Sequence, residues 1–321
     1  MSVLLLGNYR LSFAAVDDVP IRKFSGSAWR GLFGHSLKKT LCITQSEDCC
    51  RCLLYYSCGY SYLFETPPPP TAEKMRKYQA APHPFVLLPL HSEEMHFKPG
   101  EYFSVGIRLF GKANSYLPYV IQAWKNAGAS GLGQGIHRFK LAAVEQETQP
   151  GSGQWKPIYQ PDNPLTPLLP APPEFPPIPG TVQIHLSSPL RLQQEGKLVS
   201  AEKLTFSSFF RPLLRRISML SYFHSEQPLE VDFKQLSQQS DAVELTSPEL
   251  TWQKQRRYSS RQNNSISMSG ILGEFNLNPE QLEPFWPYLW LGQWTGVGKG
   301  TVMGQGQYLI NPENLEETPL N

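Results

Sequence analysis

A histidine followed by two lysines, His35, Lys38 and Lys39, is the first group of residues that could do chemistry. An imidazole can take up or release a proton near neutral pH, and a lysine can stabilise developing negative charge. All three side chains fall on one face of a helix predicted over residues 28–41. The other face is an apolar stripe, made of Trp29, Leu32, Phe33, Leu37 and Leu41. This spacing predicts an amphipathic helix that carries His35 on its polar face.

Two glycines interrupt the same predicted helix, Gly31 and Gly34. Each weakens a helix by about 1 kcal/mol relative to alanine. One interpretation is that they thin the surface beside His35, so that a bulky molecule can approach it.

All five cysteines lie between residues 42 and 58. Cys49-x-x-Cys52 has the spacing of one zinc knuckle, and Cys42 and Cys58 would complete a four-thiolate site with Cys50 spare. Such a site would hold a structural zinc ion or an iron–sulfur cluster. The other interpretation, reduced thiols around a loop, stays open. Because a disulfide framework would spread its cysteines more widely, the pattern favours a reducing, cytoplasmic setting.

A glycine-rich stretch near the end of the chain, residues 292–306, contains Gly296, Gly298, Lys299 and Gly300. An apolar, helix-like segment precedes it and a strand-like segment follows, so it is neither a Walker A loop nor a dinucleotide fingerprint. Glycines let backbone N–H groups approach a phosphate, although a single such loop could equally be a flexible connection. The pattern Gly131-x-Gly133-x-Gly135 repeats this arrangement earlier in the chain, which favours a shared structural role.

The order strand, helix, two strands, helix, glycine loop and strand occurs twice in the sequence. It predicts an α+β protein of two tandem ferredoxin-like (βαββαβ, RRM-like) domains, each with a Gly-rich loop before its last strand. We expect the first domain over residues 1–148, with a Cys-rich insertion at 42–65. A proline-rich linker over residues 149–180 and a second domain over 181–321 follow.

Composition bounds the class of protein. The 321 residues are 40% hydrophobic and carry a net charge of +2, so two cores can form and global disorder is excluded. No apolar run approaches the roughly 18 residues of a membrane span. The stretch containing Arg256, Arg257, Tyr258 and Arg261 interleaves cations with an aromatic ring, which is typical of stacking on unpaired RNA bases. A solvated strand edge protected by charge is the alternative.

The sequence resembles the CRISPR repeat-RNA-processing endoribonucleases of the RAMP (repeat-associated mysterious protein) superfamily. The resemblance extends over almost the whole chain. It is carried by Trp29-Arg30-Gly31-Leu32-Phe33-Gly34-His35-Ser36-Leu37, Cys49 to Cys52 and Cys58 to Glu65, Ser188-Pro189-Leu190-Arg191-Leu192, Arg257-Tyr258-Ser259-x-Arg261-Gln262, and the glycine-rich loop at 296–306.

This resemblance implies RNA cleavage without a metal or other cofactor. The 2′-OH before the scissile bond attacks the phosphorus, leaving a 2′,3′-cyclic phosphate and a 5′-OH end. His35 is the implied acid or base, Lys39 or Lys38 would stabilise charge, and Tyr9 is a further candidate for a helping hydroxyl. His137 is the alternative catalytic histidine. The expected RNA-binding residues are Arg30, Arg256, Arg257, Tyr258, Arg261, Gly296, Gly298, Lys299 and Gly300.

The expected partner is CRISPR repeat RNA within precursor guide RNA, with CRISPR effector or adaptation proteins as further candidates. Two other functions stay open. One is a non-catalytic RAMP subunit that binds guide RNA in an effector complex. The other is a cysteine-metal protein in which RNA binding is incidental.

Overall fold

Strand β1 (Leu6–Ala15) shows how the first half of the chain builds its core. Tyr9, Leu11 and Phe13 are buried and alternate with Arg10 and Ser12, which are partly exposed. Because successive side chains of a strand point to opposite faces, β1 has one apolar and one polar face. It pairs antiparallel with β5 (Tyr102–Phe110) and β6 (Phe139–Glu147). The sheet order is β3-β5-β1-β6-β7, in which β3 is Phe85–Pro89 and β7 is Trp155–Tyr159.

The structure is a computed structural model that describes residues 4–23, 25–72, 80–89, 94–133, 136–259 and 264–312. The chain divides into two units. Unit 1 comprises Met1–Pro173 and Met219–Leu229, and unit 2 comprises Glu174–Ser218 and Glu230–Asn321. Among the described residues, no helix has both the length and the apolar character needed to cross a bilayer.

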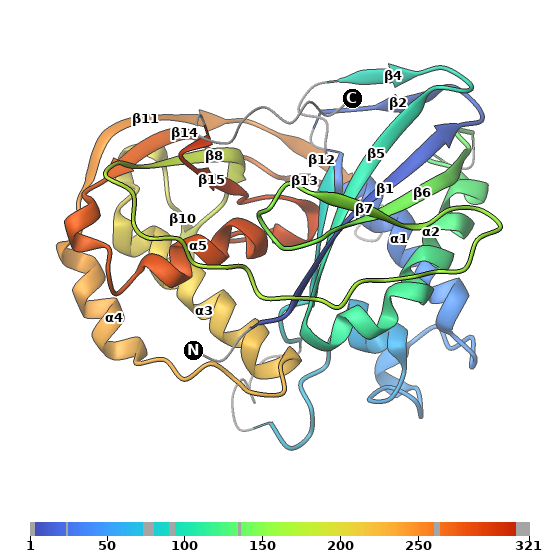
Figure 1. Ribbon diagram of the computed structural model, residues 1–321, viewed down its shortest axis with the longest axis horizontal. Coiled ribbons are helices and arrows are strands. Elements are labelled where there is room, and N and C mark those ends of the chain that lie inside the picture. The colour runs from blue at the N-terminus through green and yellow to red at the C-terminus, as the bar shows by residue number, and fades with distance from the viewer. Residues whose placement is uncertain are drawn as a thin grey trace. The chain divides into compact units, whose positions relative to one another are not determined.

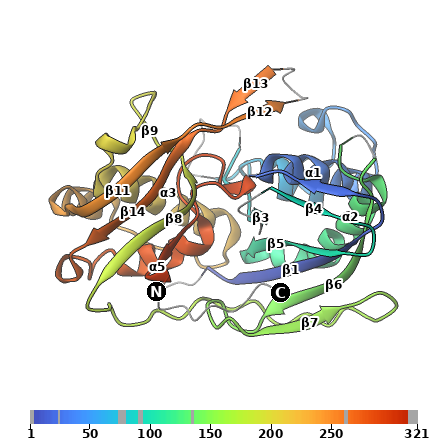
Figure 2. The same ribbon diagram turned by 90° about the horizontal axis from the view of Figure 1, so that it is seen from above.

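Helices α1 (Gly26–Leu41) and α2 (Leu117–Ser130) cover the apolar face of the unit 1 sheet (Figure 2). Trp29, Phe33 and Leu37 of α1 are buried, as the predicted stripe requires. The ring of Phe33 stacks on Trp124 of α2, with 5.2 Å between centroids. The remaining elements of unit 1 are β2 (Val19–Ile21), β4 (Met95–Phe97), the short helical turns η1 (Cys49–Arg51) and η3 (Gly111–Tyr116), and a π-helical turn, η2 (Ser61–Glu65).

Unit 2 repeats this plan with β8 (Val182–Leu190), β11 (Leu245–Gln253), β14 (Gly270–Leu277) and β15 (Tyr308–Ile310), in the sheet order β11-β14-β8-β15. Helices α3 (Phe206–His224) and α5 (Trp286–Thr295) supply its core (Figure 1). The ring of Phe209 contacts those of Phe275 and Tyr308, at centroid distances of 5.7 and 5.2 Å. Smaller elements are β9 (Gln193–Gln194), β10 (Lys197–Leu198), η4 (Ala201–Lys203), α4 (Phe233–Gln239), η5 (Ser240–Ala242), β12 (Arg256–Ser259), β13 (Asn264–Ser267), η6 (Pro279–Gln281) and η7 (Thr301–Met303).

Both sheets therefore have the strand order of a ferredoxin-like fold, in which the first strand lies between the third and the fourth. The two units also end their second helix in the same way. Gly131 after α2 and Gly296 after α5 have φ of 74° and 66° and ψ of 163° and 172°. Each donates its N–H to the carbonyl four residues back, at 2.9 Å. The predicted pair of ferredoxin-like domains is confirmed, and the shared cap supports a duplication.

The proline-rich segment over residues 149–180 is not a simple spacer, because part of it belongs to unit 1. β7 pairs with β6, and Leu6 exchanges backbone hydrogen bonds with Ala171 at 3.0 and 3.2 Å. The side-chain amide of Gln146 bonds both the N–H and the C=O of Leu168. Proline lacks an N–H, so a proline-rich segment has few backbone donors. The backbone groups of Leu168 and Ala171 hold this extended segment along the sheet.

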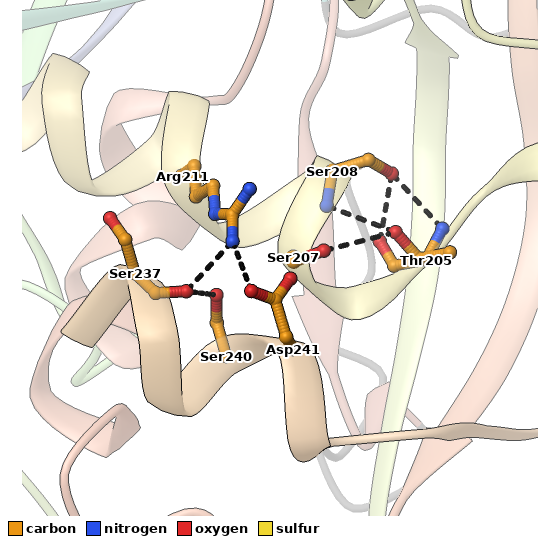
Figure 3. A network of polar contacts seen from close by, with 7 residues as sticks. All are labelled: Thr205, Ser207, Ser208, Arg211, Ser237, Ser240 and Asp241. Atoms are coloured by element: carbon orange, nitrogen blue, oxygen red, sulfur yellow. Dashed lines mark hydrogen bonds and ion pairs between the residues drawn. The ribbon is translucent and has the colours of Figure 1, made fainter. Parts of the chain in front are cut away.

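The arginines of α3 are partly structural. Arg211 binds the carbonyl of Ser237 and the carboxylate of Asp241, and so ties α3 to the end of α4 (Figure 3). At the start of α3, Thr205 accepts a hydrogen bond from the N–H of Ser208, whose hydroxyl accepts one from the N–H of Thr205. This reciprocal pair closes the first turn of the helix.

Candidate active site

His35 is held on the exposed face of α1. The buried side chains of Trp29, Phe33 and Leu37 fix the opposite face of the helix against the core. The imidazole makes no hydrogen bond or ion pair with any residue that the structure describes. Either ring nitrogen is therefore available to exchange a proton with a ligand.

The two lysines near His35 have different surroundings. Lys38 is half-buried, and its Nζ donates to the carbonyl of Glu47 at 3.3 Å and lies 5.9 Å from the ring centroid of Tyr60. Lys39 is exposed and follows His35 by one turn on the same face. Residues three and four apart are both neighbours on a helix, so spacing alone does not separate the two lysines. Lys39 is the better placed to share a ligand with His35, because it is exposed and Lys38 already bonds the carbonyl of Glu47.

Tyr9 lies in the core instead of on the surface. Its side chain is 1% exposed, and its hydroxyl donates to Oδ1 of Asn114 at 3.0 Å. Burial raises the pKa of this phenol well above its usual value. This placement argues against the helping role predicted for Tyr9. The alternation of Tyr9 with Leu11 and Phe13 along β1 already predicts that the Tyr9 side chain is buried.

Arg30, predicted to bind RNA, packs against an aromatic cluster. Its guanidinium lies 4.3 Å from the ring centroid of Phe64, and Nη2 is 3.5 Å from Nε2 of His83. The ring of Phe64 also stacks on Tyr60 and Phe85, at 5.5 and 6.1 Å between centroids. Arg30 therefore has a structural role in unit 1, and its RNA contact stays a prediction.

Gly34 is required by this cluster, because a Cβ at position 34 would collide with the ring of Phe64. We expect Gly34→Ala to lower the free energy of unfolding by about 1–3 kcal/mol, since the ring is held by its neighbours and cannot shift freely. Thermal or denaturant unfolding measures the change. An unaltered or raised melting temperature would contradict this explanation of the glycine.

His137, the alternative histidine, follows the first glycine-rich loop. Its Nδ1 lies 2.5 Å from the carbonyl of Asp18, so Nδ1 carries the hydrogen and Nε2 is left as an acceptor. Gly131 and Gly133 of this loop have positive φ, and Gly135 lies outside the described residues. Because Nε2 of His137 stays open to a ligand, this bond does not decide between the two histidines, and the choice of His35 stays a prediction.

The cysteines do not assemble a metal site in the described part of the chain. No group of three or more ligand side chains is placed to hold a metal ion there, and all five thiols are free. The hydroxyl of Thr44 lies between two of the predicted ligands, 3.9 Å from Sγ of Cys42 and 3.3 Å from Sγ of Cys52. Its hydrogen bond lowers the pKa of Cys52, whereas burial raises the pKa of Cys49. The predicted cluster of Cys42, Cys49, Cys52 and Cys58 is thus not preformed.

The C-terminal glycine-rich loop is shorter than predicted, because residues 292–295 belong to α5. Its backbone is bound to the protein. The N–H groups of Val297, Lys299 and Gly306 donate to the carbonyls of Gly306, Arg191 and Pro189, at 2.9, 2.9 and 3.1 Å. These amides are therefore unavailable to a phosphate.

Packing explains the glycines of this loop. Gly298 and Gly306 have φ of 83° and 66°. A Cβ at Gly298 would lie 2.5 Å from the carbonyl oxygen of Arg191, and one at Gly306 would collide with that of Val297. The loop is thus folded tightly on the end of β8, while the side chain of Lys299 is exposed.

Arg216 of α3 supports the start of this loop. Its Nε donates to the carbonyl of Thr295, the last residue of α5, at 2.7 Å. Enclosure of the guanidinium lowers the pKa of Arg216 to about 10. A cation at a helix C-terminus is favourable, so this arginine caps α5. It is not an open RNA contact.

The basic stretch forms a hairpin that extends the β11–β14 pair (Figure 2). Arg256, Arg257 and Tyr258 lie on its first strand, β12, where Arg256 is opposite Ser267. The side chains of residues 256–259 lie outside the described part of the structure, and so does the whole of Arg261. The hairpin backbone is thus established, and its RNA contacts stay predictions.

Sequence reasoning missed a pair on the polar face of the unit 2 sheet. Nδ1 of His185 lies 3.4 Å from Oε2 of Glu274, whose other oxygen accepts from the amide of Gln183 at 3.1 Å. The register of β8 against β14 brings them together. Alternation along each strand could place these residues on one face, but the register could not be read from the sequence.

Comparisons with known proteins agree with this architecture. Residues 4–171 match a family of N-terminal domains, AF_1859_N, and residues 184–308 match the CRISPR-associated endoribonuclease Cas6. The C-terminal part of the chain, residues 184–308, belongs to the Cas6 family. The chain is accordingly an endoribonuclease of CRISPR precursor RNA. Among curated proteins, no sequence matches it.

Solved Cas6 structures share the fold. A Cas6 product complex is 16% identical with a TM-score of 0.55, covering 95% of this chain and 99% of the other. Thermus thermophilus Cas6 is 16% identical with a TM-score of 0.54, covering 97% and 100%. A chain of a partial Cas6-RT-Cas1--Cas2 complex is 14% identical with a TM-score of 0.53, covering 96% of this chain and 46% of the other.

Proposed function

We propose that this Cas6-family chain cleaves CRISPR repeat RNA by internal transesterification, with His35 moving the proton. The 2′-oxygen forms a bond to phosphorus as its hydrogen leaves, and the bond from phosphorus to the 5′-oxygen breaks as that oxygen gains a proton. The products are a 2′,3′-cyclic phosphate and a 5′-OH. The observation that carries the proposal is His35 itself, exposed on α1 and bound to no described residue.

Lys39 is proposed to stabilise the charge that develops on the phosphoryl oxygens. It is exposed one turn after His35, whereas Lys38 is occupied by the carbonyl of Glu47. An ammonium group near these oxygens favours the transition state over the ground state. The deciding experiment is cleavage of labelled repeat RNA in EDTA by wild type and His35→Ala. Specific binding without cleavage by the wild type would instead favour a non-catalytic guide-RNA-binding subunit.

We expect Lys299→Ala to weaken RNA binding without changing stability, because its side chain is exposed and its backbone alone holds the loop. Loss of one phosphate contact lowers the slope of log K against log salt concentration by about 1. Fluorescence titration at several salt concentrations measures this slope. Lys197→Ala, at an exposed position of β10, is the control. An unchanged slope for Lys299→Ala would remove this side chain from the interface.

The RNA-binding surface is proposed to include the β12–β13 hairpin, through Arg256, Arg257, Tyr258 and Arg261. CRISPR adaptation proteins are proposed as further partners, on the likeness to a chain of the Cas6-RT-Cas1--Cas2 complex. Co-purification with the adaptation proteins of the same CRISPR locus would test this second proposal.

A further inference from the structure

Gly31 is a glycine that the described structure does not require. It lies in the interior of α1, one turn before His35, on the exposed face of the helix. Outside the adjoining turns of α1, a Cβ at this position would meet no atom of the described residues within 4 Å. Gly34, three residues on, is different because a Cβ there would collide with Phe64. Of Gly31 and Gly34, only Gly34 is thus explained by packing.

A glycine in a helix interior lowers stability relative to alanine, because the unfolded backbone is freer and no side chain covers the helix. The chain has glycine at position 31, with this lower helix stability, although an alanine would fit there. The empty space over Gly31 is therefore a feature of the surface and not a consequence of crowding.

Helix geometry links this space to the reacting atoms. The Cα–Cβ bonds of an α-helix tilt toward its N-terminus, so a side chain covers the surface over the preceding turn. The turn before His35 is the one that contains Gly31. A nucleotide whose phosphate reaches the imidazole over this turn would bring its sugar and base close to position 31.

We propose that Gly31 is a positioning residue, which leaves room for a nucleotide adjoining the scissile phosphate to lie against α1 beside His35. The proposal rests on the proposed function of His35. Gly31 acts by leaving space for the substrate and takes no part in proton transfer. A side chain at position 31 would displace the phosphate from the imidazole, while the helix itself would become more stable.

The test compares Gly31→Ala and Gly31→Leu with wild type. Gly180→Leu is the matched control, because a Cβ at Gly180 also meets no described atom within 4 Å and this residue lies in unit 2. Single-turnover cleavage and RNA binding are measured on repeat RNA, and unfolding is measured by heating. Three RNAs are used. One is intact, and each of the other two lacks the base of one of the two nucleotides joined by the scissile bond. Both abasic RNAs retain the 2′-OH groups.

We expect both Gly31 variants to melt a few degrees higher, by about 2 °C for alanine. Gly31→Leu should cleave intact RNA about 10- to 100-fold more slowly, as expected for a misplaced reacting group, and Gly31→Ala less so. With one of the two abasic RNAs, the ratio of wild-type to Gly31→Leu rates should fall to about 3 or less, because the side chain no longer meets a base. Gly180→Leu should cleave like wild type.

Normal cleavage by Gly31→Leu would overturn the proposal, and so would a slow variant that neither abasic RNA rescues. Failure of the proposed function has a different signature. In that case His35→Ala cleaves as fast as wild type, or wild type does not cleave, whatever residue occupies position 31.

Discussion

Replacing His35 by alanine is expected to lower the rate of repeat-RNA cleavage by about 10²- to 10⁴-fold, the usual contribution of a positioned acid or base. RNA affinity should change by less than about 3-fold, because the side chain is exposed and contributes no packing to α1. Single-turnover cleavage in EDTA measures the rate, and fluorescence titration measures the affinity. Product analysis should find a 2′,3′-cyclic phosphate with wild type.

His137→Ala is the matched control, since it removes an imidazole from the same unit. It should retain most of the activity, because the proposed mechanism assigns the proton transfer to His35. Lys39→Ala should be slower than wild type and faster than His35→Ala. If His35→Ala cleaves normally and His137→Ala does not, the catalytic assignment passes to His137.

Gly306→Ala is expected to lower the free energy of unfolding by about 2–4 kcal/mol. Its φ of 66° is a left-handed conformation, which costs an alanine about 1 kcal/mol or more. The added Cβ would also collide with the carbonyl of Val297, so the hydrogen bond from Val297 to Gly306 must lengthen or break. Denaturant unfolding measures the loss. The control is Gly180→Ala, whose Cβ would meet none of the described atoms within 4 Å.

This variant separates two explanations of the glycine-rich loop. If the glycines serve chain packing, Gly306→Ala unfolds more easily and loses RNA binding only in proportion to the unfolded fraction. If they serve close approach of phosphate, Gly306→Ala loses affinity while its melting temperature stays that of wild type. The second outcome would contradict the packing explanation. It would favour the interpretation from the sequence, in which the loop's backbone N–H groups bind a phosphate.

The fold is largely predictable because its signals are local. The spacing of Trp29, Phe33 and Leu37 marks the buried face of α1, and the alternation of Tyr9, Leu11 and Phe13 marks that of β1. The two glycine-rich loops fall at the same place in two copies of one element order. Local patterns do not show which strands pair with each other. Strand β7, which pairs with β6, could therefore not be predicted within the proline-rich segment.

The site is less predictable, because the same residue type serves opposite roles. Lys38 and Lys39 are adjacent, yet only the structure shows that Lys38 bonds the carbonyl of Glu47. The sequence does not distinguish Arg30 and Arg216 from surface cations, but one packs on Phe64 and the other caps α5. The cysteine spacing is compatible with zinc, whereas the position of Thr44 between Cys42 and Cys52 is a three-dimensional fact.

Unit 1 is discontinuous in sequence, because its last piece is Met219–Leu229. The carbonyl of Pro82 accepts a hydrogen bond from Nε2 of His224 at 2.8 Å, and the hydroxyl of Tyr62 lies 3.1 Å from its Nδ1. A ribosome adds about 5–20 residues per second, so Met219–Leu229 is synthesised several seconds after Pro173. Until then the Tyr62 hydroxyl and the Pro82 carbonyl lack His224 as a hydrogen-bond partner. A protein fragment that ends at Pro173 would never acquire this partner.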